Sequence, residues 1–148
     1  MFDVLKGSCA LPVLYRGDVR VGSESLVDVG VSDPIPALEA YRRGARRILV
    51  VRSRPAAYVK MDGWSVRASA WLLRGKPAVA RAVTRTAERY EAAVRFLESP
   101  PEDCRVLQVA PTEALATRRT TQDPALLERD YALGRKLGED SMRRWEAL

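Results

Sequence analysis

The 148-residue sequence contains no histidine and only two cysteines, Cys9 and Cys104. A Ser-His-Asp or Cys-His catalytic arrangement therefore cannot form within the chain, and neither can a histidine-built zinc site. The two cysteines lie far apart and lack the spacing of metal ligands, so we expect reduced thiols and predict no metal or other cofactor. Any acyl-transfer chemistry in this chain has to use a carboxylate or a lysine as its base.

Long hydrophobic runs are also missing. No apolar segment approaches the roughly 18 to 20 residues that a membrane-spanning helix needs. The N-terminal sequence MFDVLKGSCALP has no basic region followed by a long apolar stretch, so no signal peptide is predicted. Hydrophobic residues make up 47% of the chain and charged residues 30%, which indicates a folded protein. We expect a cytoplasmic location, with peripheral attachment to a membrane as the alternative.

Acidic residues are fewer than basic ones: the chain has 19 acidic and 25 basic residues, which gives a net charge of +6. Only 7% of the residues are aromatic, and acidic residues are interspersed among the arginines, so nucleic-acid binding is not expected. Solvated helix faces are the favoured interpretation of the arginines. Attraction to an anionic lipid surface is the alternative.

The best-defined pattern in the chain covers residues 25–51. Residues 25–30 are predicted to be extended, and residues 34–44 form a helix that Ser32 or Asp33 caps and Gly44 ends. The apolar run at residues 48–51 is typical of a strand covered on both faces. Strand, helix and strand together predict an α/β fold with a partial parallel sheet.

Beyond Pro55 the chain is predicted to be mainly helical, with one short strand. The predicted helices cover residues 62–74, 77–98 and 124–147, and the predicted strand covers residues 105–109. Asp123 caps the last helix, whose inner face is predicted to carry Leu127, Tyr131, Leu137 and Trp145. We therefore divide the chain into an α/β part at residues 1–55 and a helical C-terminal extension at residues 56–148.

Two residues, Asp28 and Ser53, stand where an open α/β sheet binds ligands, beyond the carboxyl ends of its strands, and Arg52 and Arg54 flank Ser53. Asp28 precedes the predicted helix, and Arg52 and Arg54 follow the predicted strand. Asp28 either organises its turn or has a function; because Ser32 and Asp33 already supply a cap, the functional role is favoured. Arg52 and Arg54 would suit a phosphate or carboxylate headgroup, although solvated side chains are the favoured interpretation.

A nucleophile is harder to find. Ser8 and Cys9 have no base nearby in sequence, and the segment KGSCALP lacks the Gly-x-Ser-x-Gly turn that exposes a catalytic serine. No such turn occurs elsewhere in the chain, and no glycine-rich run supplies backbone N–H groups for an oxyanion.

The segment SLVDVGVSDPIP at residues 25–36 resembles the patatin-like phospholipases, together with KGSCALPVLYRG before it and PALEAYRRGARRILVVRSRP after it. That family uses a Ser-Asp dyad without histidine. The resemblance implies that Asp28 is the general base and that Gly30 is the last residue of the aspartate motif, with Val29 in place of the middle glycine. Residues 56–148 look like the helical C-terminal extension of a bacterial branch.

The resemblance implies the C-terminal portion of a lipid acyl hydrolase, inactive alone because the serine and the oxyanion loop are absent. Its substrate would be a lipid or another acyl ester, and a second polypeptide would supply the serine in trans. The alternative is a non-catalytic basic module that binds anionic membranes or a partner protein. A partial sheet also exposes an edge, so self-association is predicted.

Overall fold

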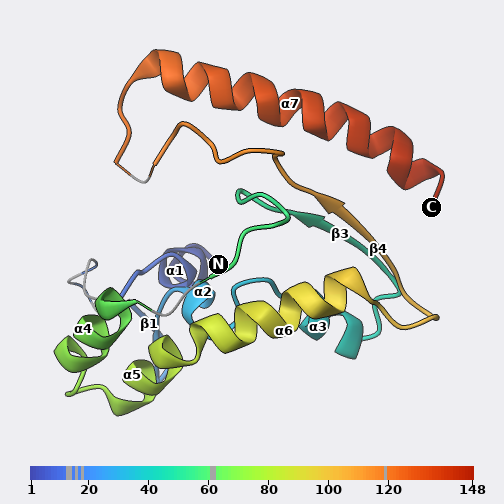
Figure 1. Ribbon diagram of the computed structural model, residues 1–148. Helices are drawn as coiled ribbons and strands as arrows, with labels where there is room; N and C mark the ends of the chain where they lie inside the picture. Colours follow the sequence, from blue (N-terminus) through green and yellow to red (C-terminus); the bar gives the residue numbers. More distant parts are fainter. Residues whose placement is uncertain (13–14, 16, 18, 61–62, 119) are drawn as a thin grey trace. The chain divides into compact units, whose positions relative to one another are not determined.

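The computed structural model describes residues 1–12, 15, 17, 19–60, 63–118 and 120–148. The chain forms two compact units, each assembled from two segments (Figure 1). Unit 1 comprises residues 1–36 and 60–95, and unit 2 comprises residues 37–59 and 96–148. These units do not follow the boundary at residue 55 suggested by the sequence, and a catalytic role for residues 1–55 stays a prediction.

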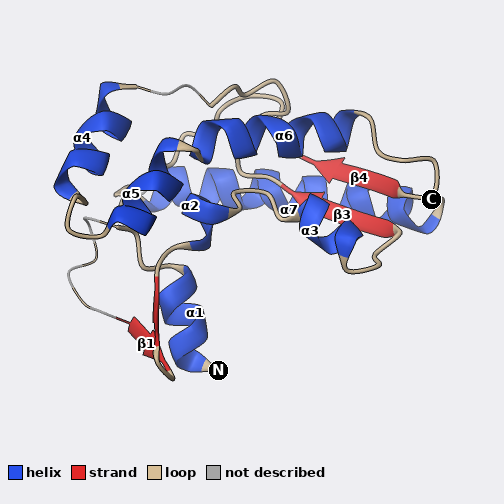
Figure 2. Ribbon diagram, turned by 90° about the horizontal axis from the view of Figure 1, so that it is seen from below, coloured by secondary structure: helices blue, strands red, loops and turns tan. Residues whose placement is uncertain are grey.

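Unit 1 begins with helix α1 (Phe2–Ser8) and a hairpin of two short strands, β1 (Val19–Val21) and β2 (Glu24–Leu26) (Figure 2). The strands pair antiparallel, with Val19 opposite Leu26. Gly22 lies in the turn between them with φ of 61°, a left-handed conformation that glycine adopts without a steric penalty.

The predicted strand at residues 25–30 is wrong beyond Leu26. Residues from Val29 onward form the short helix α2 (Val29–Ser32), because the Asp28 carboxylate accepts a hydrogen bond from the Gly30 amide and fixes a helix start. Within the described part of the chain β2 pairs with β1 alone, so the predicted parallel strand–helix–strand unit that joins it to residues 48–51 is wrong too.

The rest of unit 1 is helical, with α4 (Trp64–Leu72), α5 (Pro77–Thr84) and most of α6 (Thr86–Glu98). The helix predicted over residues 77–98 is interrupted at Arg85. There the buried Thr86 hydroxyl lies 3.0 to 3.2 Å from the carbonyl oxygens of Val83, Ala82 and Val31. One side chain thus supports the break between two helices and contacts the end of α2.

Unit 2 contains α3 (Ala37–Arg42), β3 (Arg47–Val51), β4 (Arg105–Val109) and α7 (Pro124–Glu146). The two strands form a parallel pair in which Leu49 lies opposite Leu107. Gly44 ends α3 with φ of 99°, and the hydrogen bonds from Gly44 N to Tyr41 O and from Ala45 N to Ala40 O complete a Schellman motif. The strands at residues 48–51 and 105–109 and the role of Gly44 are therefore confirmed.

Helix α7 packs on β4 and covers the face that carries Leu107 and Val109, both buried (Figure 1). Its N-terminal cap is confirmed, because Asp123 accepts a hydrogen bond from Ala125 N at 2.9 Å. The predicted inner face is wrong at Leu127 and Tyr131, whose exposed fractions are 47% and 62%. A 23-residue helix is about 35 Å long, roughly twice the length of a five-residue strand, so its first half extends past the sheet.

Two polar clusters tie unit 2 together. The Asp103 carboxylate accepts a hydrogen bond from the Tyr41 hydroxyl at 2.9 Å and forms an ion pair with Arg46 at 2.8 Å; the first contact raises the pKa of Tyr41. Asp130 on α7 accepts hydrogen bonds from the hydroxyl and the amide of Thr117, which lower the pKa of Asp130. The molecule is thus a mixed α/β protein, as expected at that coarse level, with two small separate sheets.

Candidate functional site

Asp28 lies half-buried between β2 and α2 in unit 1. The Oδ1 atom of Asp28 accepts a hydrogen bond from the Gly30 amide at 2.7 Å. The backbone amide of Asp28 donates a hydrogen bond to the carbonyl oxygen of Ala10 at 2.9 Å. A Cβ atom at Gly30 would lie 2.9 Å from that oxygen, so the absence of a side chain at residue 30 permits this cap.

The functional interpretation of Asp28 depended on Ser32 and Asp33 providing the helix cap. Those residues instead end α2, and Asp28 itself supplies the cap at its start. Turn formation therefore accounts for both Asp28 and Gly30. Among the described residues, no serine or cysteine side chain forms a hydrogen bond with the Asp28 carboxylate.

Among the residues that the structure describes, none contacts the Ser8–Cys9 pair as a base would. The Ser8 hydroxyl donates to the Leu5 carbonyl oxygen at 2.8 Å within α1 and lies 3.9 Å from the Cys9 sulfur atom. Both cysteines are free, with Cys9 exposed and Cys104 buried. In the part of the chain that the structure describes, no three histidine, cysteine or acidic side chains gather as metal ligands would.

Arg52 and Arg54 belong to unit 2, whereas Asp28 belongs to unit 1. Arg52 is buried and donates to the side-chain oxygen of Gln108 at 3.0 Å, so the favoured prediction of a solvated side chain is wrong for this residue. The guanidinium of Arg54 lies exposed, 5.1 Å from the centre of the Tyr58 ring.

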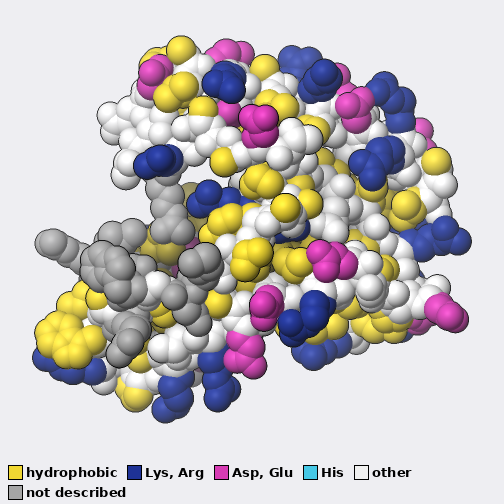
Figure 3. All heavy atoms as spheres, viewed as in Figure 1, with side chains coloured by type: hydrophobic (Ala, Val, Ile, Leu, Met, Phe, Trp, Pro, Cys, Tyr) yellow, Lys and Arg dark blue, Asp and Glu magenta, His cyan; other side chains and the backbone are white. Residues whose placement is uncertain are grey.

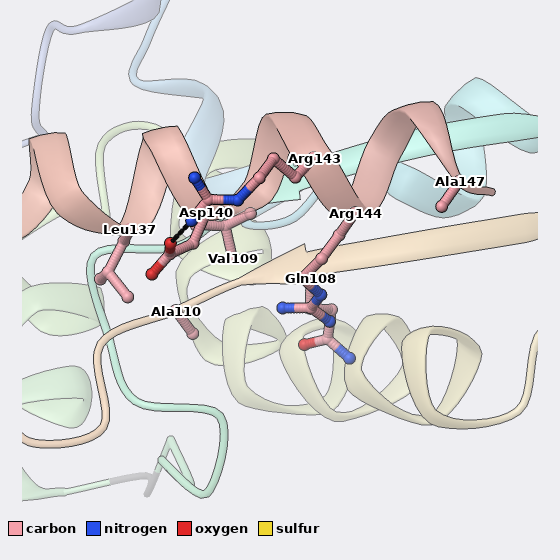
Figure 4. A pocket seen from close by; sticks show the side chains of 8 residues that line it. All are labelled: Gln108, Val109, Ala110, Leu137, Asp140, Arg143, Arg144 and Ala147. Atoms are coloured by element: carbon pink, nitrogen blue, oxygen red, sulfur yellow. Dashed lines mark hydrogen bonds and ion pairs between the residues drawn. The ribbon is translucent and has the colours of Figure 1, made fainter.

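A wide surface cavity of about 580 Å³ lies in unit 2, between the carboxyl end of β4 and α7 (Figure 4). Gln108, Asp140, Arg143 and Arg144 provide its polar lining. Arg143 forms an ion pair with Asp140, and the Arg144 side chain extends from α7 toward Gln108. The lining thus carries one more positive than negative charge.

A different concentration of charge lies on the helical hairpin formed by α4, α5 and their connecting turn. Residues 63–87 contain five basic residues and no acidic one, in a chain whose net charge is +6. Arg74, Lys76, Arg81 and Arg85 are exposed, and none of these four forms an ion pair with a described residue. The expectation that acidic residues intersperse the arginines is therefore wrong for this segment.

Large apolar side chains lie beside these cations. Trp71 and Leu72, at the end of α4, have exposed fractions of 63% and 56%. The Arg74 guanidinium lies 4.4 Å from the centre of the Trp71 ring. In the space-filling view, hydrophobic and basic side chains adjoin where α4 and α5 lie (Figure 3). A 25-residue window of charge would have revealed this segment from the sequence.

The turn that holds this arrangement is well defined. Leu73 N donates to Ser69 O at 3.0 Å and Lys76 N donates to Leu73 O at 2.7 Å, while Pro77 occupies the start of α5, where its missing N–H is not needed. Val79 on α5 is half-buried, whereas the four cations named above are exposed, so the hairpin presents its positive charge to solvent. None of the described helices combines the length and hydrophobicity needed to cross a bilayer.

Comparison with known proteins identifies two matches. Residues 76–148 match the model of a domain of unknown function (DUF6363). Over 141 residues the chain is 33% identical to the "Uncharacterized protein YjjU" of Escherichia coli (strain K12), which covers 92% of this chain and 38% of that protein. The chain therefore spans well under half the length of this relative. No solved structure matches the chain.

These matches overturn the resemblance to the patatin-like phospholipases. Neither the matching family model nor the E. coli relative carries a patatin-like description, and the half-sheet which that resemblance implied does not form around residues 25–30. The misleading signal was a short segment of small and apolar residues around one aspartate, which here specifies a hairpin strand followed by a capped helix.

Proposed function

We propose that the hairpin of α4 and α5 binds anionic lipid surfaces, and that the chain acts as a basic membrane-associating module. The observation that supports this most directly is the exposed Trp71 and Leu72 beside the cations of the connecting turn. Tryptophan favours the headgroup level of a bilayer, where its ring is half in apolar surroundings. Arginine and lysine gain from the negative surface potential of the same region.

The energetics favour reversible binding. Each basic side chain near an anionic surface contributes about 1 kcal/mol, so the four exposed cations named above contribute about 4 kcal/mol. Insertion of Trp71 and Leu72 adds a term for buried apolar area. Since the charge term is screened by salt, binding should be strong at low ionic strength and should weaken as salt rises.

Vesicle flotation tests this proposal on the intact chain. We expect the chain to float with vesicles containing phosphatidylserine at low salt and to dissociate progressively as NaCl rises toward about 0.5 M. With vesicles of phosphatidylcholine alone we expect it to remain unbound at the bottom of the gradient. Equal binding to both kinds of vesicle, or binding that salt does not weaken, would contradict the electrostatic mechanism.

A second candidate function concerns Asp28. We propose that its carboxylate acts as the general base of a lipid ester hydrolase whose nucleophile lies in polypeptide outside these 148 residues. The supporting observation is that one oxygen is fixed by Gly30 while the side chain stays half-exposed, which leaves the second oxygen to accept a proton. The extra length of the E. coli relative shows that additional polypeptide accompanies this region in at least one protein.

The test uses a nitrophenyl ester with this chain and with the full-length E. coli relative. We expect no turnover by the chain, turnover by the relative, and a loss of at least about 100-fold when the aspartate aligned with Asp28 is changed to asparagine. Asparagine preserves the capping oxygen, so the fold is maintained and the unfolding midpoint serves as the control. Full activity of that variant would eliminate the general-base role.

A further inference from the structure

We propose that the outer edge of β3 is the docking site for an additional parallel strand, supplied by polypeptide outside these 148 residues. Among the described residues, β3 pairs with β4 alone and the two form a two-stranded sheet. Sheets of two strands are marginal, and parallel sheets occur with more strands and with both faces covered.

The hydrogen bonds at the two ends of the pair fix which backbone groups of β3 are available. Arg105 N donates to Arg46 O at 2.8 Å, and Arg52 N donates to Val109 O at 2.8 Å. In a parallel pair, alternate residues face the partner strand, so Ile48 and Val50 direct their amides toward β4. The amides and carbonyls of Arg47, Leu49 and Val51 therefore point to the opposite edge.

The side chains along β3 are only partly covered, just as its backbone is hydrogen-bonded along one edge only in the described residues. Leu49 and Val51 are 39% and 75% exposed, whereas Leu107 and Val109, which lie opposite them on β4, are 3% and 7% exposed. Helix α7 thus covers this face over β4, whereas over β3 it contacts Arg47 through Trp145 and leaves Leu49 and Val51 exposed. The segment RILVV has no proline or lysine, the residues that commonly protect an edge strand from pairing.

The direction of the strands selects the occupant. A symmetric dimer that hydrogen-bonds β3 to the β3 of a second copy is antiparallel, because the two-fold axis between two such paired edges runs perpendicular to the strands and reverses their direction. Continuing the parallel sheet therefore requires a strand of different sequence. The relative offers a source, because the chain matches only 38% of it and the remainder has ample length for further strands. This inference does not depend on lipid binding by the hairpin or on Asp28.

Amide hydrogen exchange, read residue by residue, tests the edge directly. In this chain alone, the amides of Leu49 and Val51 should exchange on the order of tenfold or more faster than those of Ile48 and Val50, at every protein concentration. In the full-length E. coli relative, the amides aligned with Leu49 and Val51 should be as protected as their neighbours. Rapid exchange at those two positions in the relative would overturn the proposal.

A matched pair of substitutions gives an independent readout. Changing the residue aligned with Val51 to aspartate should lower the melting temperature of the full-length relative by several degrees, while Val51→Asp leaves this chain unchanged. The control is Val59→Asp, because Val59 is 66% exposed in the same unit but lies outside the strand; it should be neutral in both proteins. A dimeric mass of this chain together with slow exchange at Leu49 would identify a second copy as the occupant and contradict the proposal.

Discussion

Changing Arg74, Lys76 and Arg81 together to glutamine is expected to weaken binding to phosphatidylserine vesicles about 100-fold. The estimate follows from about 1 kcal/mol per basic side chain and about 1.4 kcal/mol per tenfold change in affinity. All three side chains are exposed, so the fold should not change. Vesicle flotation at low salt, over a range of lipid concentrations, provides the measurement.

The matched control removes the same charge elsewhere. Arg42, Arg129 and Lys136 are exposed in unit 2, and changing all three to glutamine lowers the net charge by the same amount. This control should keep its affinity within about threefold, because these three side chains lie outside the hairpin of α4 and α5 that is proposed to bind the surface. Equal losses in the two triple variants would show that total charge, and not the hairpin, determines binding.

Leu107→Ala should have the largest effect on stability, with a loss of about 2 to 5 kcal/mol in the free energy of unfolding. Leu107 is 3% exposed at the centre of β4, beneath α7, so removing its side chain leaves a cavity that neighbouring atoms fill only in part. A domain of this size is stable by only about 5 to 15 kcal/mol, so the urea midpoint should fall sharply.

Leu49→Ala is the control for that experiment. Leu49 lies opposite Leu107 in the same register but is 39% exposed, so its truncation should cost about 1 kcal/mol. A comparable loss from both substitutions would mean that β3 is covered as fully as β4 in solution. That result would also count against an open edge at β3.

Local signals predicted the elements that carry them. The Asp123–Pro124 start of α7, Gly44 after α3 and the apolar run in β3 each specify their structure within a few residues, and all three elements occur. The prediction that the strand is covered on both faces is wrong, because Leu49 and Val51 are 39% and 75% exposed. The pairing of β3 with β4 joins segments separated by 53 residues between Val51 and Arg105, and no local pattern encodes it. Long-range pairing of this kind depends on packing that a single sequence does not display.

The error around Asp28 had a local cause. Val27, Val29 and Val31 are β-branched residues that favour a strand, whereas the Asp28 carboxylate and Gly30 favour a helix start. The hydrogen bond between these two groups prevails, and the strand stops at Leu26. In the same way the net charge of +6 averages over the whole chain and hides the hairpin of α4 and α5, where five basic residues occur without an acidic one.

The chain passes from one compact unit to the other after residues 36, 59 and 95, so neither unit is a continuous stretch of sequence. The region that matches the domain of unknown function, residues 76–148, contains β4 but not β3. Excising that region as an expression fragment would deprive β4 of its hydrogen-bonded neighbour and leave α5 without α4. The smallest segment that keeps these partners together is therefore longer than the family match at residues 76–148. A gene rearrangement at residue 76 would separate β4 from β3 and α5 from α4.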